Sequence, residues 1–153
     1  MSILTLPDKP SELIRLAVKD GHEMLRKSNI EPRSSMYWHK SFEMEFAGRY
    51  VPCKACLAGA VMYNSLGAKV DVSYNPWTWN THTTNRLLAI NSIRLGHYHK
   101  AIWNCGIKSS EKLRRKIRDI SKPKNRIFNS RKEFEALLDE LGPIADQFEE
   151  IGL

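Results

Sequence analysis

The sequence predicts a mainly α-helical protein, with six or seven helices in one compact domain and a small β element of two or three strands. The length of 153 residues suits a single domain, which we expect to span residues 1–153. Apolar residues recur at spacings of three and four over most of the chain, as they do on the buried face of a helix. Stretches that alternate apolar and polar residues, which indicate half-buried strands, are few and short.

The β element is expected in the first half of the chain. Residues 42–46 alternate apolar and acidic side chains, and they can form a short hairpin with residues 50–51. Residues 70–72 alternate in the same way. Between these strands, residues 53–66 predict a buried helix that begins directly after Pro52.

Residues that commonly start or end helices mark most of the helix boundaries. Pro10 fits the first turn of the first helix, with Asp8 or Ser11 as its capping residue. Ser130 and Glu133 form a capping-box pattern at the start of the C-terminal helical region. The expected helices span about 11–27, 53–66, 81–95, 97–105, 109–121, 130–141 and 144–151, the last two being separated by Gly142-Pro143.

The composition excludes several classes of protein. Hydrophobic residues make up 42% of the chain and charged residues 27%, so a wholly disordered chain is not expected. No apolar run approaches the roughly 20 residues that cross a membrane, and residues 1–10 lack the pattern of a secretory signal. We therefore expect a cytoplasmic protein without a membrane partner. The three cysteines predict free thiols or a metal site instead of a disulfide framework.

The net charge of +7 is distributed unevenly along the chain. Residues 107–132 contain eleven Lys or Arg and two acidic residues, whereas residues 133–153 contain seven acidic residues and no Lys or Arg. A basic helix at about 109–121 can contact phosphates or an acidic protein surface, unless the acidic helix at about 130–151 folds over it and neutralises it. The candidate partner-binding residues in this region are Lys112, Arg114, Arg115, Lys116, Arg118, Lys122, Lys124 and Arg126.

A loop over residues 74–80 adds two aromatic candidates for partner binding, Trp77 and Trp79. Exposed aromatic side chains can stack on nucleic-acid bases or anchor a protein partner. The alternative is that this loop folds back and covers the small residues 58–60 of the preceding helix.

The Cys53-x-x-Cys56 motif has three possible explanations. Thiols at a helix N-terminus can serve redox exchange, and two cysteines can supply half of a zinc site. Cys105 and one of His39, His97 or His99 would complete such a site. The third explanation, which we favour, is that Cys56 packs in the core. We therefore predict no cofactor.

Two H-x-[ST] patterns, at His39 and His82, suggest an alternative function as a two-histidine phosphoesterase-like or nucleotide-handling enzyme. Enzymes of that type place the motifs on strands that line a cleft, whereas here His82 lies in a threonine-rich capping segment and His39 is expected in a loop. The sequence contains no phosphate-binding glycine loop, metalloprotease motif or nucleophile elbow. We therefore predict a non-enzymatic protein with no catalytic residues.

The segment from Cys53 to Met62, Cys-Lys-Ala-Cys-Leu-Ala-Gly-Ala-Val-Met, resembles a segment of small, uncharacterised bacteriophage proteins. In those proteins Trp-His precedes the segment, as Trp38-His39 does here. A helix with Leu, Ala-Ile-Asn and Arg-x-Gly follows, as between Leu88 and Gly96. The resemblance covers roughly residues 37–103, and the basic and acidic segments have no counterpart in it.

The resemblance implies a phage or prophage accessory protein made in bacterial cytoplasm. Proteins of this size and origin often inhibit host machinery, including defence nucleases. We therefore expect an anti-defence, anti-CRISPR-like inhibitor that binds a host protein or nucleoprotein complex, or its DNA or RNA. A nucleic-acid-binding regulator is the closest alternative function.

Overall fold

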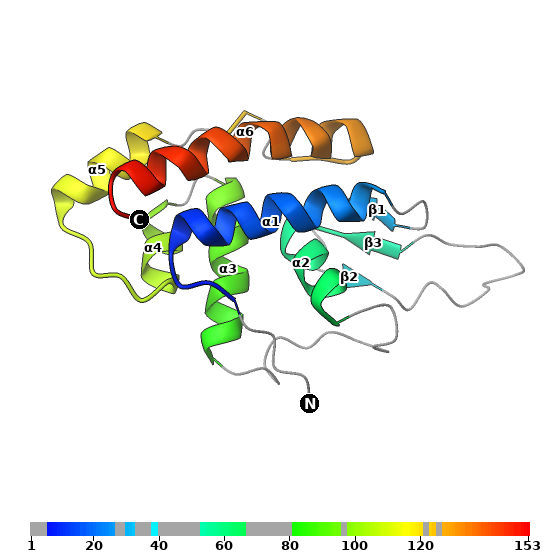
Figure 1. The fold of residues 1–153 in the computed structure, drawn as a ribbon, viewed down its shortest axis with the longest axis horizontal. Helices are drawn as coiled ribbons and strands as arrows, with labels where there is room; N and C mark the ends of the chain where they lie inside the picture. Colours follow the sequence, from blue (N-terminus) through cyan, green and yellow to red (C-terminus); the bar gives the residue numbers. More distant parts are fainter. Residues whose placement is uncertain are drawn as a thin grey trace, which may run out of the picture.

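The computed structural model describes residues 6–26, 30–32, 38–39, 53–66, 81–95, 98–120, 123–124 and 127–153. In this part of the chain the protein is mainly helical, which confirms the predicted class (Figure 1). Among these described residues, no helix has both the length and the apolar character needed to cross a membrane. The helices are α1 (Pro10–Leu25), α2 (Leu57–Leu66), α3 (Thr81–Leu95), α4 (Tyr98–Asn104), α5 (Glu111–Ile120) and α6 (Arg131–Glu150).

Helices α1 and α6 lie side by side and antiparallel, and their contact is the most extensive between helices of the described chain (Figure 1). α1 buries a stripe that includes Leu13, Ala17 and Met24, while α6 buries seven apolar side chains along its length. Such apolar burial is the main stabilising term in folding. At one end of the pair, the backbone N–H and the hydroxyl of Ser11 both donate to the Leu153 carbonyl, each at 3.0 Å.

The start of α1 differs from the prediction, because neither expected side chain caps it. The N-cap residue is Lys9, whose side chain makes no capping hydrogen bond, and Pro10 occupies the first turn as predicted. The hydroxyl of Ser11 instead donates to the Leu153 carbonyl. The Asp8 carboxylate accepts a hydrogen bond from Arg86 of α3 at 3.0 Å. The two side chains that the sequence predicts as caps, those of Asp8 and Ser11, therefore make long-range contacts instead.

Helix α6 is continuous, although Gly142-Pro143 predicts an interruption. A proline inside a helix removes one backbone hydrogen bond, but the buried apolar stripe continues across it, with Leu141 before and Ile144 after. Burial of this stripe against α1 holds both halves on one axis. The predicted capping box is confirmed, because the Ser130 hydroxyl accepts the backbone N–H of Glu133 at 3.1 Å.

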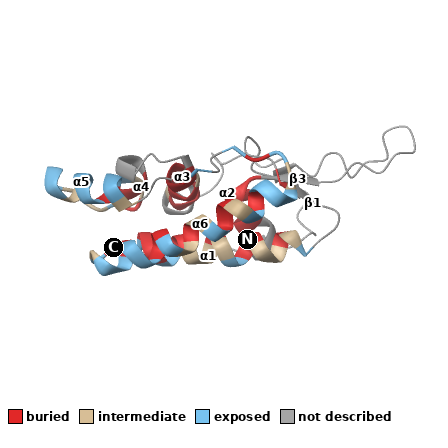
Figure 2. Cartoon of the chain, turned by 90° about the horizontal axis from the view of Figure 1, so that it is seen from above, coloured by how far each residue is buried: buried red, intermediate tan, exposed pale blue. Residues whose placement is uncertain are grey.

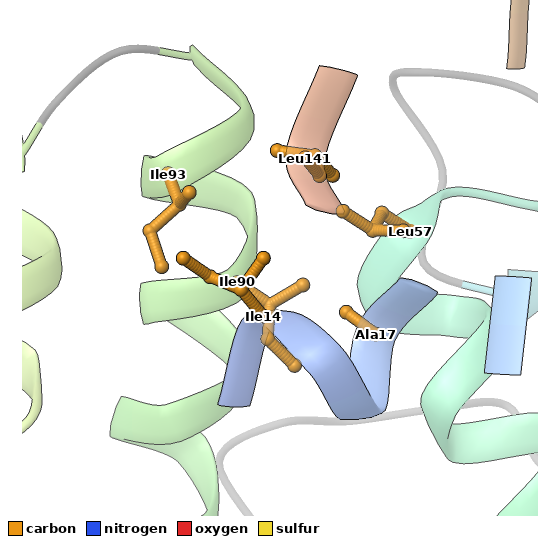
Figure 3. Close-up of a pocket in the computed structure, with 6 residues that line it drawn as sticks. All are labelled: Ile14, Ala17, Leu57, Ile90, Ile93 and Leu141. Carbon is orange, nitrogen blue, oxygen red and sulfur yellow. The ribbon is translucent and has the colours of Figure 1, made fainter. Parts of the chain in front are cut away.

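Helices α3, α4 and α5 form a second layer beside the layer of α1 and α6 (Figure 2). Apolar side chains from four helices meet between the two layers, and the space they enclose has no room for a water molecule (Figure 3). This contact is therefore part of the packed core and offers no ligand site. The converging side chains are Ile14 and Ala17 of α1, Leu57 of α2, Ile90 and Ile93 of α3, and Leu141 of α6.

The described residues also contain three short paired strands, β1 (Ile30–Pro32), β2 (Trp38–His39) and β3 (Cys53–Ala55). β3 lies in the middle, parallel to β1 and antiparallel to β2. The stretches that the sequence predicts as strands, residues 42–46, 50–51 and 70–72, lie outside the described residues. The β element as predicted is therefore not supported by the structure.

The predicted helix over 53–66 begins later than expected. Cys53 to Ala55 are extended as β3, and α2 begins at Leu57. Cys56 takes the position before the helix, where its carbonyl accepts the N–H of Ala60 at 2.9 Å and its sulfur accepts that of Gly59 at 3.4 Å. Because β3 pairs with β1 and β2, the backbone N–H and C=O groups of residues 53–55 have hydrogen-bond partners without forming a helix.

Candidate docking surface on α5

Helix α5 is anchored through one face only. Ile117 is buried, and Leu113 and Ile120 are half-buried at the same side of the helix. Ser110 starts the helix, because its hydroxyl accepts the Leu113 N–H at 3.2 Å and its carbonyl accepts the Arg114 N–H at 3.0 Å. The helix therefore packs through this apolar face, and most of the circumference of α5 is left to solvent.

The solvent-exposed face of α5 carries five basic residues, which we name the basic surface. All five side chains belong to exposed residues, and they are Lys112, Arg114, Arg115, Lys116 and Arg118. They lie on a helix of ten residues, which is about 15 Å long. Like charges at this density repel one another, so an anionic partner that lies against them lowers the free energy of the surface.

Local contacts neutralise little of the basic surface. Arg115 pairs with Glu111 of the same helix at 3.1 Å, but the two side chains are 73% and 78% exposed. A pair of this kind contributes only about 0.3–0.5 kcal/mol and exchanges readily with solvent or ligand. The Arg114 Nε donates to the Ser109 hydroxyl at 3.1 Å, which leaves the positive charge in place.

Three acidic residues of α6, Glu140, Asp146 and Glu149, have partners elsewhere in the protein. Arg15 of α1 donates to Asp146 at 2.9 Å and to Glu149 at 2.5 Å. The hydrogen bond from Arg15 to Asp146, followed by that to Glu149, raises the pKa of Arg15. Glu140 accepts the backbone N–H of Lys124 at 3.0 and 3.1 Å. Within the described residues, no ion pair joins the basic surface to α6, so the alternative in which the acidic helix neutralises the basic helix gains no support there.

The remaining predicted partner-binding residues are only partly within the description. Lys124 is exposed, and its backbone N–H donates to the Glu140 carboxylate at 3.0 Å. Lys122 and Arg126 lie outside the described residues, and so do Trp77 and Trp79. The candidate surface is therefore defined by the five basic residues on α5.

The two described thiols belong to the core. Cys56 and Cys105 are buried. Burial raises the pKa of the Cys56 thiol, and it raises the pKa of Cys105 to about 11. A raised pKa keeps a thiol protonated and unreactive near neutral pH. Cys56 therefore packs in the core, which is the third of the three explanations given for the motif. Cys53 lies on β3, and its side chain is outside the description.

Metal-binding and two-histidine chemistry gain no geometric support. Among the described residues, no three His, Cys, Asp or Glu side chains are grouped so as to hold a metal ion. His39 lies on β2 and His82 in the first turn of α3. Their backbone positions are thus a strand and a helix, and not the two strands used by the phosphoesterases. The imidazoles of both residues are outside the description, as is that of His99 on α4.

The structure reveals two features that the sequence analysis missed. Arg86 of α3 is buried, and it donates to the Asn104 carbonyl and to Asp8. Trp103 of α4 is 76% exposed, the most exposed of the large apolar residues in the described chain. The helical period could have indicated that Trp103 is exposed. Ala101 and Ile102 lie on the buried side of the helix, which places Trp103 on the opposite side. No sequence signal marks Arg86, since its partners are distant along the chain.

Comparison with known protein families, with curated proteins and with solved structures found no match for the chain.

Proposed function

We propose that this chain is a non-enzymatic binding protein that docks on nucleic acid through the basic surface of α5. The nucleic acid is either free or part of a bacterial defence complex, which the chain would inhibit as a phage accessory protein. The phage origin and the anti-defence role rest on the sequence resemblance. The binding role rests on one observation, the exposure of five basic side chains of which only Arg115 has an ion pair in the described structure.

Phosphate is the anion that best suits this surface. Nucleic acids carry closely spaced phosphates with condensed counterions, and each Lys or Arg that contacts a phosphate releases counterions to solution. The arginines can also bind phosphate in a bidentate manner. An acidic protein surface lacks this counterion term, so we favour nucleic acid as the partner.

The test is the charge reversal of four residues on α5, Arg114→Glu, Arg115→Glu, Lys116→Glu and Arg118→Glu, in the full chain. We expect the affinity for fluorescently labelled DNA, measured by anisotropy, to fall by at least about two orders of magnitude. For the unchanged protein, we expect log affinity against log salt to have a slope between about −2.7 and −4.5, as three to five phosphate contacts require.

A matched control separates the docking surface from the net charge. Lys9→Glu, Lys19→Glu, Arg26→Glu and Lys132→Glu produce the same change in net charge at exposed residues away from α5. This variant should retain most of the affinity. Circular dichroism should show that both variants keep their helices. If the α5 variant binds DNA as tightly as the unchanged protein does, or if binding is insensitive to salt, the proposed function is wrong.

A further inference from the structure

We infer that α5 binds double-stranded DNA by entering the major groove, with phosphate contacts on both sides of the helix and Arg115 directed at the base edges. This inference rests on the proposed function and specifies its ligand. It depends on how the five basic residues are distributed around the circumference of α5.

The basic residues divide into two flanks and a tip. Successive residues of a helix are rotated by roughly 100°, so residues four apart lie on one side. Measured from the buried face at Ile117, Arg114 and Arg118 fall on one flank of α5, while Lys112 and Lys116 fall on the other. Arg115 lies between the flanks, almost opposite the buried face, and the exposed residue Asp119 shares the tip with it.

This arrangement matches the cross-section of a major groove. The groove is about 12 Å wide, and an α-helix with its side chains is about 10–12 Å across. A helix in the groove has one phosphate backbone on each side and base edges ahead of it. Two pairs of basic residues on opposite flanks can therefore contact both backbones. A helix lying on a single strand or on a flat anionic surface would use one side only.

The position of α5 in the molecule allows such an approach. Both views place α5 at one end of the molecule, beyond α4 (Figures 1 and 2). Only the face with Leu113, Ile117 and Ile120 packs on the protein. The acidic side chains Asp146 and Glu149 of α6 are held by Arg15.

The tip of α5 has the chemistry of base recognition. Arginine donates two hydrogen bonds to the O6 and N7 atoms of guanine, the commonest specific contact in the major groove. Arg115 would exchange its exposed pair with Glu111 for this contact, and Glu111 would then be able to accept a hydrogen bond from cytosine N4. B-form DNA is the ligand implied, because the major groove of double-stranded RNA is too deep and narrow for side chains to read.

Single-stranded nucleic acid is the rival ligand, and Trp103 is the residue that favours it. An exposed aromatic ring near basic residues is typical of proteins that stack single-stranded bases. Trp103 lies on α4, outside the two-flank pattern of α5, and α4 packs against α5. The groove arrangement predicts that Trp103→Ala leaves duplex binding unchanged.

The experiment selects bound sequences from a random duplex DNA library about two helical turns long. The full chain should enrich a short motif that contains guanine. The selected duplex, a shuffled duplex, one strand alone and the RNA duplex of the same sequence are then compared by anisotropy. We expect the selected DNA duplex to bind most tightly.

The variants distinguish reading of the bases from contact with phosphates. Arg115→Ala should lose roughly 5- to 150-fold in affinity for the selected duplex and little for the shuffled one. Lys116→Ala should weaken both duplexes equally and reduce the salt slope by about 0.9. Arg26→Ala is the matched control, because Arg26 is also exposed and pairs with a glutamate of its own helical segment, Glu23. It should change neither affinity.

Two outcomes would overturn this inference while leaving the proposed function in place. In one, the protein binds a single strand or the RNA duplex as tightly as the selected DNA duplex. In the other, selection enriches no motif, or Arg115→Ala weakens all duplexes equally. Failure to bind any nucleic acid would overturn the proposed function as well.

Discussion

At the scale of single residues, burial controls the acid–base behaviour of Cys105. Its side chain lies at the end of α4 in the core, where the charged thiolate is poorly solvated. Burial is the largest cause that raises its pKa, and the pKa reaches about 11 against an ordinary value of 9.0. The folded chain thus retains this proton over a range of pH in which the unfolded chain loses it.

The stability of the fold should therefore fall as pH rises from about 9 to about 11. The group binds its proton more tightly in the folded state, so its contribution is complete below the unfolded pKa and is lost as pH passes the folded value. We expect this thiol to account for about 2–3 kcal/mol of the decrease in the free energy of unfolding. Urea denaturation at about pH 8 and about pH 10.5 measures it.

Cys105→Ala provides the control for this prediction. The variant is less stable at every pH because it leaves a small cavity, but its stability should fall less steeply over the same alkaline range. Equal pH dependence in the two proteins would show that other groups, and not this thiol, cause the alkaline loss.

At the scale of elements, the contact of α1 with α6 depends on a close approach at Gly21. A Cβ atom at this position would lie 2.6 Å from Leu138 Cδ2 and 3.2 Å from Phe134 Cζ, both on α6. Gly21 weakens the helix by roughly 0.5–1 kcal/mol relative to alanine. The absence of a side chain here lets the two helices approach.

Gly21→Ala should destabilise the protein by about 1 kcal/mol. Overpacking against Leu138 costs about 1–3 kcal/mol, and the better helix propensity of alanine offsets part of this. The shift of the urea midpoint measures the change. In a Leu138→Ala background the same substitution should be neutral or stabilising, because the clash is gone. A Gly21→Ala protein more stable than the original would contradict the close approach.

Two of the helical predictions show what local pattern can do at this scale. The capping box at Ser130 and the position of Pro10 in the first turn of α1 both follow from residues within one turn of each other. Gly142-Pro143 shows the limit, because the packing of α6 on α1 carries the helix through a sequence that would end it in isolation.

At the scale of the whole molecule, Arg86 connects three segments that are distant in the sequence. Its guanidinium donates to Asn104 at the end of α4 and to Asp8 ahead of α1. The Arg86 side chain is 8% exposed and the Asp8 side chain 76% exposed. Arg86 thus ties α3 and α4 of the second layer to the segment ahead of α1 through a largely buried group.

Replacement of the buried Arg86 should therefore destabilise the protein more than replacement of the exposed Asp8. Arg86→Met keeps the volume but leaves the Asn104 carbonyl without this donor, and we expect a loss of about 2 kcal/mol. Asp8→Asn keeps an acceptor oxygen at the surface and should cost about 1 kcal/mol or less. Thermal and urea unfolding of both variants check this. A larger loss for Asp8→Asn than for Arg86→Met would show that the charge of Asp8 dominates the contact.

The charge of the molecule is also segregated at this scale. The basic surface lies on α5, while Asp146 and Glu149 of α6 are held against α1 by Arg15. The sequence shows the two charged blocks but leaves open whether they pair. α1 makes the most extensive contact with α6 and α5 also contacts it, but among the described residues no ion pair joins the basic surface to α6.

The sequence by itself determined the helical class, most helix boundaries and the presence of a strongly basic segment, because period, capping and charge are properties of neighbouring residues. Only the tertiary structure decided that α6 continues through Pro143, that Cys53 is extended, that Ser11 bonds to Leu153 and that the α5 cations face solvent. In each case a contact between distant segments decides between local preferences. A helix cap or a difference in helix propensity changes the free energy of folding by roughly 1 kcal/mol, and long-range burial and hydrogen bonding contribute more.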